Sequence, residues 1–257
     1  MSSFLVRKTA NLIFARKLTP RKVYLVQRVL AFSTSPLFVR TITPGVDVKQ
    51  FLETLREQRW DDHRFYHHCR INQSLHLISA LSFLGSYVML FINPVWSAIV
   101  AWTFSMTTRQ AGHFFFEPHS YDHVNQASHE HKEEIKVGYN LKRKVVLLSI
   151  WALLPMAIYF NPGFLGILPE HNDWLSYIEA VGAAWLYLGI AAVLFRGIQL
   201  FVQQDLKTGI VWMTKIITDP FHDVYIYYKA PLHLLRGERF ERDPVMDMGD
   251  LEPVPNH

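Results

Sequence analysis

The sequence of 257 residues contains one cysteine, Cys69. A single cysteine excludes a disulfide framework within the chain, and it excludes zinc or iron–sulfur sites built from several cysteines. The sequence also lacks a phosphate-binding glycine loop, a Gly-x-Ser-x-Gly nucleophile elbow and internal repeats. The net charge of +4 is explained by the membrane pattern described below. We therefore expect no nucleic-acid partner.

Charged residues are absent from residues 71–108, a run of 38 residues that is interrupted only at Asn93-Pro94. A helix that spans a bilayer needs about 20 mostly apolar residues. Four segments approach this length: residues 75–92, 95–116, 145–160 and 177–202. A soluble helical protein with very apolar core helices is the alternative, but uncharged stretches this long are rare in soluble folds. The sequence predicts an all-α, polytopic membrane protein with a four-helix transmembrane bundle.

Basic residues are distributed unevenly around these segments. The turns at residues 93–94 and 161–174 contain no Lys or Arg, whereas the loop at residues 117–144 and both terminal regions contain several. By the positive-inside rule, both termini and the loop at residues 117–144 lie on the same side of the membrane. We expect a single membrane-embedded domain at residues 47–235, followed by a polar C-terminal tail at residues 236–257.

The N-terminal arm, residues 1–46, contains eight Lys or Arg residues and no acidic residue. Such a basic, acid-free composition is typical of a mitochondrial targeting segment. The arm predicts a multi-pass protein of the mitochondrial inner membrane. In the alternative interpretation the arm lies on an anionic lipid surface, for example that of the endoplasmic reticulum.

Histidine is concentrated near the ends of the first two apolar segments, where nine of the thirteen histidines lie between His63 and His131. Ionisable side chains at membrane depth usually face a functional interior, and histidine is the commonest metal ligand. His68, Asn72 and His76 are spaced i, i+4 and i+8, which places them on one stripe of a helix. His67 adds a further imidazole. The spacing predicts a metal site at the basic face.

The second segment ends with a similar stripe, formed by Arg109, His113 and Glu117. The tight turn at Asn93-Pro94 makes the two segments antiparallel neighbours, so we expect His113 to lie near His76. Several imidazoles with one carboxylate form the ligand set of non-haem iron oxygenases. Interfacial hydrogen bonding of the same residues is the simpler alternative.

Other polar residues are predicted to have ordinary structural roles. The loop histidines His119, His123, His129 and His131 lie in a charge-rich stretch that is typical of a solvated helix face. Residues 142–144, Lys-Arg-Lys, end the third segment at the head groups. Asp219-Pro220 predicts a helix start in an interfacial segment. His222, between two aspartates, is an alternative candidate for a residue that orients a ligand.

Two stretches, "FYHHCRINQSLH" and "GHFFFE", resemble the two signatures of the Mpo-like family, membrane proteins that include fungal 2-hydroxy-fatty-acid dioxygenases. The matching positions are Tyr66, His67, His68, Asn72, His76, Gly112, His113, Phe116 and Glu117. The resemblance covers residues 65–117, and the general arrangement of apolar segments along the chain is also similar. It implies an Fe(II)-dependent enzyme that uses molecular oxygen to shorten 2-hydroxy fatty acids by one carbon, with iron held by His67, His68, His76 and His113.

Three functional hypotheses follow. In the first, an iron dioxygenase acts on a fatty acyl lipid, with Glu117 at the metal and Arg109 paired to the substrate carboxylate. The second is a structural subunit of a mitochondrial inner-membrane complex, such as a respiratory or ATP synthase complex, with other subunits as partners. The third is a lipid-binding or hydroxylase-like protein with a two-metal histidine box. Membrane lipids are partners in all three.

Overall fold

The computed structural model describes residues 48–241. The chain divides into two units, Met1–Gly45 and Val46–His257. The targeting prediction for residues 1–46 and most of the predicted C-terminal tail lie outside the described residues and stay predictions. Within residues 48–241 there is no strand, and only two isolated bridges occur, Cys69 with Phe240 and Asp122 with Ala127. The all-α prediction is confirmed at this level.

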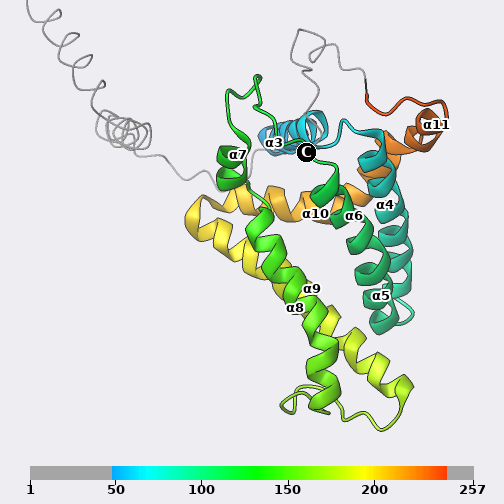
Figure 1. Ribbon diagram of the computed structural model, residues 1–257. Helices are drawn as coiled ribbons and strands as arrows, with labels where there is room; N and C mark the ends of the chain where they lie inside the picture. The colour runs from blue at the N-terminus through cyan, green and yellow to red at the C-terminus, as the bar shows by residue number, and fades with distance from the viewer. Residues whose placement is uncertain (1–47, 242–257) are drawn as a thin grey trace, which may run out of the picture. The chain divides into compact units, whose positions relative to one another are not determined.

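The α-helices are labelled in Figure 1. In chain order they are α3 (Val48–Asp61), the π-helix η1 (Asp62–Tyr66), α4 (Arg70–Leu90), α5 (Pro94–Val100), the π-helix η2 (Ala101–Met106), α6 (Thr107–Phe115), α7 (His129–Ile135), α8 (Leu141–Phe160), α9 (Trp174–Gln203), α10 (Leu206–Tyr227) and α11 (Ala230–Leu235).

Three of these helices, α4, α8 and α9, are long and apolar enough to cross a membrane. They indicate a membrane protein. The fourth expected span, residues 95–116, is not a single α-helix, because α5, η2 and α6 divide a continuous helical path from Pro94 to Phe115. A four-helix transmembrane bundle is therefore shown only in part. The wider π-helical turns of η2 interrupt the regular hydrogen-bond pattern, as is common near functional sites.

The hairpin formed by α4 and α5 has a local origin at its turn. Asn93 caps α5 by accepting hydrogen bonds from the backbone N–H groups of Val95 (3.1 Å) and Trp96 (3.2 Å). Pro94 fits the first position of the helix, where no N–H donor is needed. Since α4 packs along α5, η2 and α6, the start of α4 and the end of α6 lie at the same end of the hairpin (Figure 1).

The buried core joins η2, α8 and α9. Trp102 donates a hydrogen bond to the carbonyl of Trp185 (2.8 Å), and Trp185 donates one to the carbonyl of Trp151 (3.1 Å). At Gly182 of α9 an added Cβ would lie 2.6 Å from a Val95 side-chain carbon. Small residues that let helices approach closely are typical of membrane helix interfaces.

Arg196 of α9 faces protein rather than the membrane surface. Its guanidinium donates to the carbonyls of Val137 (2.9 and 2.6 Å) and Lys136 (3.2 Å), and the residue is 3% exposed. These bonds attach the segment before α8 to α9. The charge inside the apolar segment thus has a structural explanation.

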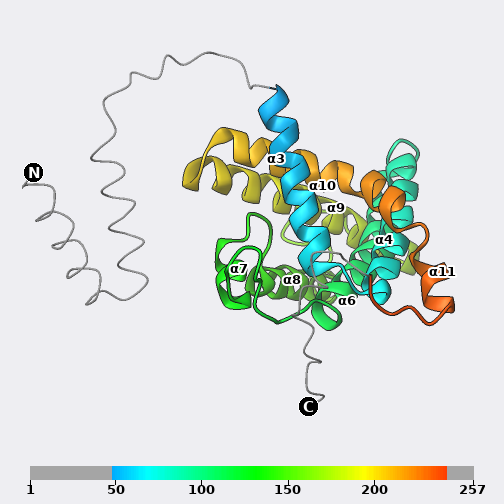
Figure 2. The same ribbon diagram turned by 90° about the horizontal axis from the view of Figure 1, so that it is seen from above.

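The prediction of a helix start at Asp219-Pro220 is wrong. Helix α10 begins at Leu206, where the Asp205 side chain accepts from the Thr208 N–H (2.7 Å), and Pro220 lies inside it. The helix continues because it packs against α4 and α9, and tertiary packing supplies most helical stability in proteins. Figure 2 shows α3 crossing α10 from above.

Asp122 anchors the loop between α6 and α7. Its buried carboxylate accepts hydrogen bonds from Arg64 (2.8 Å), from Lys132 and from the Asn125 side chain (2.9 Å). Arg64 and Lys132 also form ion pairs with Asp61, at 2.7 and 3.1 Å. This network fixes the loop onto the end of α3 and onto η1.

Candidate metal centre

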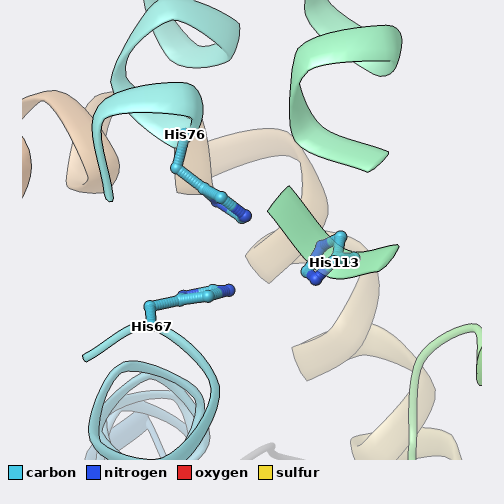
Figure 3. A group of neighbouring side chains, drawn as sticks. All are labelled: His67, His76 and His113. Carbon is cyan, nitrogen blue, oxygen red and sulfur yellow. The ribbon is translucent and has the colours of Figure 1, made fainter. Parts of the chain in front are cut away.

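Three imidazoles converge at the end of the hairpin. One ligand atom from each of His67, His76 and His113 lies within 4.8 Å of the other two. Figure 3 shows the rings pointing toward a common centre from the loop before α4, from α4 and from α6. Their ring centroids are 4.1 to 5.6 Å apart, and His76 is fully buried. Among residues 48–241 this is the one such group of three potential ligands.

Each imidazole has one ring nitrogen beside an oxygen of a neighbouring residue. His67 Nδ1 lies 3.1 Å from Tyr227 Oη, His76 Nδ1 lies 3.6 Å from Asp223 Oδ2, and His113 Nδ1 bonds Glu117 Oε1. Metal-ligating histidines almost always use their second ring nitrogen in this way, which fixes the tautomer and the ring orientation. These contacts leave Nε2 of His67 and His113 for the common centre, whereas neither ring nitrogen of His76 has a hydrogen-bond partner among the described residues.

The inner ring nitrogens fit a metal ion. His67 Nε2 and His76 Nε2 are buried and have no hydrogen-bond partner within the described residues. A buried polar atom without a partner costs free energy, which coordination of a cation offsets. Burial also lowers the pKa of His67 well below its ordinary value. The ring is therefore neutral, as a metal ligand must be.

A chain of hydrogen bonds links His67 to a surface carboxylate. Tyr227 Oη lies 3.2 Å from His63 Nδ1, and His63 Nε2 lies 3.3 Å from Glu241 Oε2. With a metal on His67 Nε2, the Nδ1–H of His67 donates to Tyr227, Tyr227 donates to His63, and His63 donates to Glu241. Hydrogen bonding by His63 is the main cause that lowers the pKa of Glu241 to about 2. The carboxylate is thus charged and completes the chain.

His68 differs from the expectation. It does not share a helical stripe with His76, because η1 ends at Tyr66, Cys69 is extended, and α4 begins only at Arg70. The His68 ring stacks on Phe240 with a centroid distance of 5.7 Å, and its Nδ1 lies 3.3 Å from the carbonyl oxygen of Phe65. Of the four expected ligands, the structure brings His67, His76 and His113 together and leaves His68 outside.

Close contact between α4 and α6 positions His76 and His113. A Cβ added at Gly112 would lie 2.2 Å from Asn72 Oδ1 and 3.3 Å from His76 Cδ2. The buried Asn72 donates to the carbonyl of Tyr66 (2.9 Å), which holds the loop that carries His67. Glycine at position 112 thus allows both the helix approach and this loop anchor.

We expect Gly112→Ala to lower the free energy of unfolding by about 1–3 kcal/mol, since the new methyl group displaces Asn72. Gly85→Ala is the matched control in α4, where an added Cβ meets no atom within 4 Å. Alanine in an open helix position stabilises by about 0.5–1 kcal/mol. Thermal unfolding in detergent measures both variants. Equal free energies of unfolding for Gly112→Ala and Gly85→Ala would contradict the close approach of α4 and α6 at Gly112.

Arg109 already has acidic partners within the protein. Its guanidinium lies 3.0 Å from Asp223 Oδ2 and 3.9 Å from Asp219 Oδ2. Since Asp223 also contacts His76, Arg109 belongs to the set of residues that orients this ring. Arg109 also lines the cavity, and its pairing with a substrate carboxylate stays a prediction. Sequence spacing placed Arg109 at the site, but its partners on α10 were not foreseen.

A cavity of about 1550 Å³ opens beside His67 and His113. His67, His113 and Glu117 line its polar end, and Ala98 near the Asn93-Pro94 turn lines the other. Between them it is lined by apolar side chains: Phe83, Met106, Leu147, Leu148, Trp185 and Ile190. The helix rise between His76 and the end of α4 corresponds to about 20 Å. The volume of the cavity and the apolar side chains in its lining suit an acyl chain.

The remaining histidines lie apart from the centre. The rings of His119 and His129 pack together at 4.4 Å, and Lys132 rather than the neighbouring His131 contacts Asp122. His222 lines the cavity but is not one of the three converging rings. A two-metal histidine box that includes the loop histidines has no counterpart within the described residues.

Sequence reasoning missed the roles of Tyr227 and His63, and it considered Asp223 only as a neighbour of His222. Asp219, Asp223 and Tyr227 are spaced i, i+4 and i+8, the same rule that drew attention to the other stripes. All three are buried on α10. The expected helix start at Pro220 concealed this stripe.

Comparison of the chain with protein-family models, with curated proteins and with solved structures finds no match.

Proposed function

We propose that the protein is a membrane-bound non-haem Fe(II) dioxygenase that acts on a fatty acyl lipid, of the 2-hydroxy-fatty-acid α-oxidation type. The observation that carries the proposal is the convergence of three imidazoles, two of them with buried unpartnered nitrogens, beside a large cavity that many apolar side chains line. The sequence resemblance to the Mpo-like family is the reason for proposing iron as the metal and a 2-hydroxy fatty acid as the substrate.

The donor set supports a first-row transition metal. Imidazole nitrogens suit zinc, copper, iron and nickel, whereas magnesium and calcium prefer oxygen. Three ligands leave coordination positions free for other molecules. When bound, iron supplies the one-electron chemistry that lets molecular oxygen react with an organic substrate.

The protein residues supply orientation and exclude water. Tyr227 and Glu117 hold the outer nitrogens of His67 and His113, and the Asp223 carboxylate lies 3.6 Å from the outer nitrogen of His76. The apolar side chains of the cavity hold the acyl tail and keep water from the reacting end. A substrate bound in this way places its head group beside His67 and His113.

An oxygen-uptake assay tests the function. Full-length protein in detergent, loaded anaerobically with Fe(II), is expected to consume oxygen with 2-hydroxypalmitate and to release a fatty acid one carbon shorter. His113→Ala is expected to abolish uptake because it removes a metal ligand. His171→Ala is the control, since His171 contacts Tyr177 outside the centre. Iron-loaded protein without uptake on any acyl chain would contradict the activity and favour the structural-subunit hypothesis.

We also propose four spans, with α5, η2 and α6 as the second. The polar loop that contains α7 and the loop between α8 and α9 then lie on opposite sides of the membrane. Cysteine labelling tests this well, because the native Cys69 is buried. Glu130→Cys and Asn172→Cys are expected to react from opposite sides, and labelling of both from one side would contradict the topology.

The mitochondrial inner membrane is the proposed location, on the basis of the basic arm at residues 1–46. Deletion of residues 1–40 is expected to abolish mitochondrial delivery of a tagged full-length protein. Residence of the intact protein in the endoplasmic reticulum would contradict the location and leave the arm as a lipid-surface element.

A further inference from the structure

Lys144 differs from the other basic side chains that line the cavity. Six Lys and Arg residues line it: Arg59, Arg109, Lys132, Lys136, Lys144 and Lys215. Five of them pair with carboxylates: Arg59 with Asp219, Arg109 with Asp223, Lys132 with Asp122, Lys136 with Glu133, and Lys215 with Asp62. Within the described residues, Lys144 forms neither an ion pair nor a side-chain hydrogen bond.

The carboxylates nearest to Lys144 already have partners. Glu117 bonds His113, and Glu133 bonds both Lys136 (2.9 Å) and the backbone N–H of Leu141 (2.6 Å). A charged group withdrawn from bulk water without a partner is costly. Glu117 and Glu133 thus attract the Lys144 ammonium only at longer range, and no carboxylate within residues 48–241 forms a direct ion pair with it.

Lys144 lies where the head group of a bound amphiphile is expected. It occupies the first turns of α8 and lines both the large cavity and a small recess formed with His113 and Glu117. The recess places it beside the metal-ligating end of α6. Lys142, two residues earlier on α8, is exposed and does not line the cavity.

We propose that Lys144 binds the anionic head group of a long-chain amphiphile whose tail lies in the apolar cavity. The proposal deepens the proposed function, because it rests on the cavity being the acyl-binding site and assigns the residue that selects an acid over a neutral lipid. An ammonium binds carboxylate or phosphate through charge-assisted hydrogen bonds. The cavity volume of about 1550 Å³ exceeds the roughly 300–1,000 Å³ of common ligand pockets. It therefore accommodates a long tail.

Binding to chelator-treated full-length protein in a non-ionic detergent tests the proposal without iron. The probes share a 16-carbon chain: palmitate, hexadecyl phosphate and hexadecanol. We expect Lys144→Met to weaken binding of the preferred acid about 10- to 100-fold, the usual effect of losing one charge-assisted hydrogen bond. Hexadecanol binding is expected to stay unchanged, and Lys144→Arg is expected to retain most of the acid affinity. Lys142→Met is the matched control for loss of one positive charge on α8.

The outcomes distinguish a carboxylate from a phosphate head group. They also test the role of Lys144 separately from the iron-dependent activity. Tighter binding of palmitate identifies a carboxylate, and tighter binding of hexadecyl phosphate identifies a phosphate head group; both support the assignment when Lys144→Met removes the preference. Unchanged acid affinity in Lys144→Met, or equal losses in Lys142→Met, would overturn it. Because the protein is metal-free, failure of the iron-dependent activity leaves this result intact.

Discussion

Replacing His76 with alanine is expected to reduce bound iron from about one equivalent per chain to a small fraction. The variant leaves two imidazoles, and even loss of a residue that only orients a ligand typically costs about 10- to 100-fold in metal affinity. His76 of α4 is fully buried against His113 of α6 and Asp223 of α10, so water replaces its nitrogen poorly. Metal analysis after gel filtration in detergent measures the loss.

His68→Ala is the control for this variant, since His68 is adjacent to His67 but its ring packs on Phe240. We expect it to retain the metal. His76→Gln preserves most of the side-chain volume and separates loss of a ligand from loss of packing. A full equivalent of iron in His76→Gln would contradict the assignment of His76 as a ligand.

Replacing Asp122 with alanine is expected to lower the free energy of unfolding by about 3–5 kcal/mol. Removing one member of a buried charged network leaves the opposite charges uncompensated. Arg64 and Lys132 are both buried and retain only Asp61, which is partly exposed. Thermal or denaturant unfolding in detergent measures the change.

Asp173→Ala is the comparison for a solvent-exposed aspartate. Asp173 caps α9 by accepting from the Ser176 N–H, and loss of such a cap typically costs about 1 kcal/mol. Equal destabilisation of the two variants would contradict the buried network.

The ion pairs of Asp122 also make the stability of the fold depend on pH. Burial raises the pKa of Asp122, but hydrogen bonds from Arg64 and Lys132 outweigh it and hold the pKa well below its ordinary value. A depressed folded-state pKa contributes stability above the unfolded value of about 3.9, and the contribution is lost as pH falls below it. Wild type is expected to lose stability below about pH 4 more steeply than Asp122→Ala.

The apolar helices and the neighbourhood of His76 and His113 were predictable because they depend on local rules. Hydropathy marked α4, α8 and α9, and the Asn93-Pro94 turn made α4 antiparallel to the path that ends in α6. In each case residues close in sequence determine the structure. The π-helical segment η2 has no comparable local marker, so the second span was expected as one regular helix.

Whether His67 or His68 faces the metal centre depends on the break in the helical path just before α4. A continuous helix from residue 68 to residue 76 places His68 on the stripe with His76, whereas the extended Cys69 turns His67 inward. The bonds from Asn72 and Gln73 to the carbonyls of Tyr66 and His67 stabilise this break. They join the first turn of α4 to a loop, which periodicity alone does not predict.

The ion pairs of Arg109, and the lack of one at Lys144, depend on residues that are distant in sequence. Arg109 pairs with Asp223, which is 114 residues away along the chain. Lys144 was expected only to end a helix at the head groups, but the pairing of the other cavity cations sets it apart. Which charged residues pair with one another depends on how α4, α6, α8 and α10 pack, and the sequence alone does not give this packing.

X-ray absorption spectroscopy of iron bound to full-length protein tests the central claim most directly. The account predicts about three imidazole nitrogens per iron at about 2.0–2.2 Å, the usual length of metal–imidazole bonds. It also predicts loss of one of them in His67→Ala, and no change in His68→Ala. An iron environment made only of oxygen ligands, or one that is the same in His67→Ala and wild type, would contradict the metal centre.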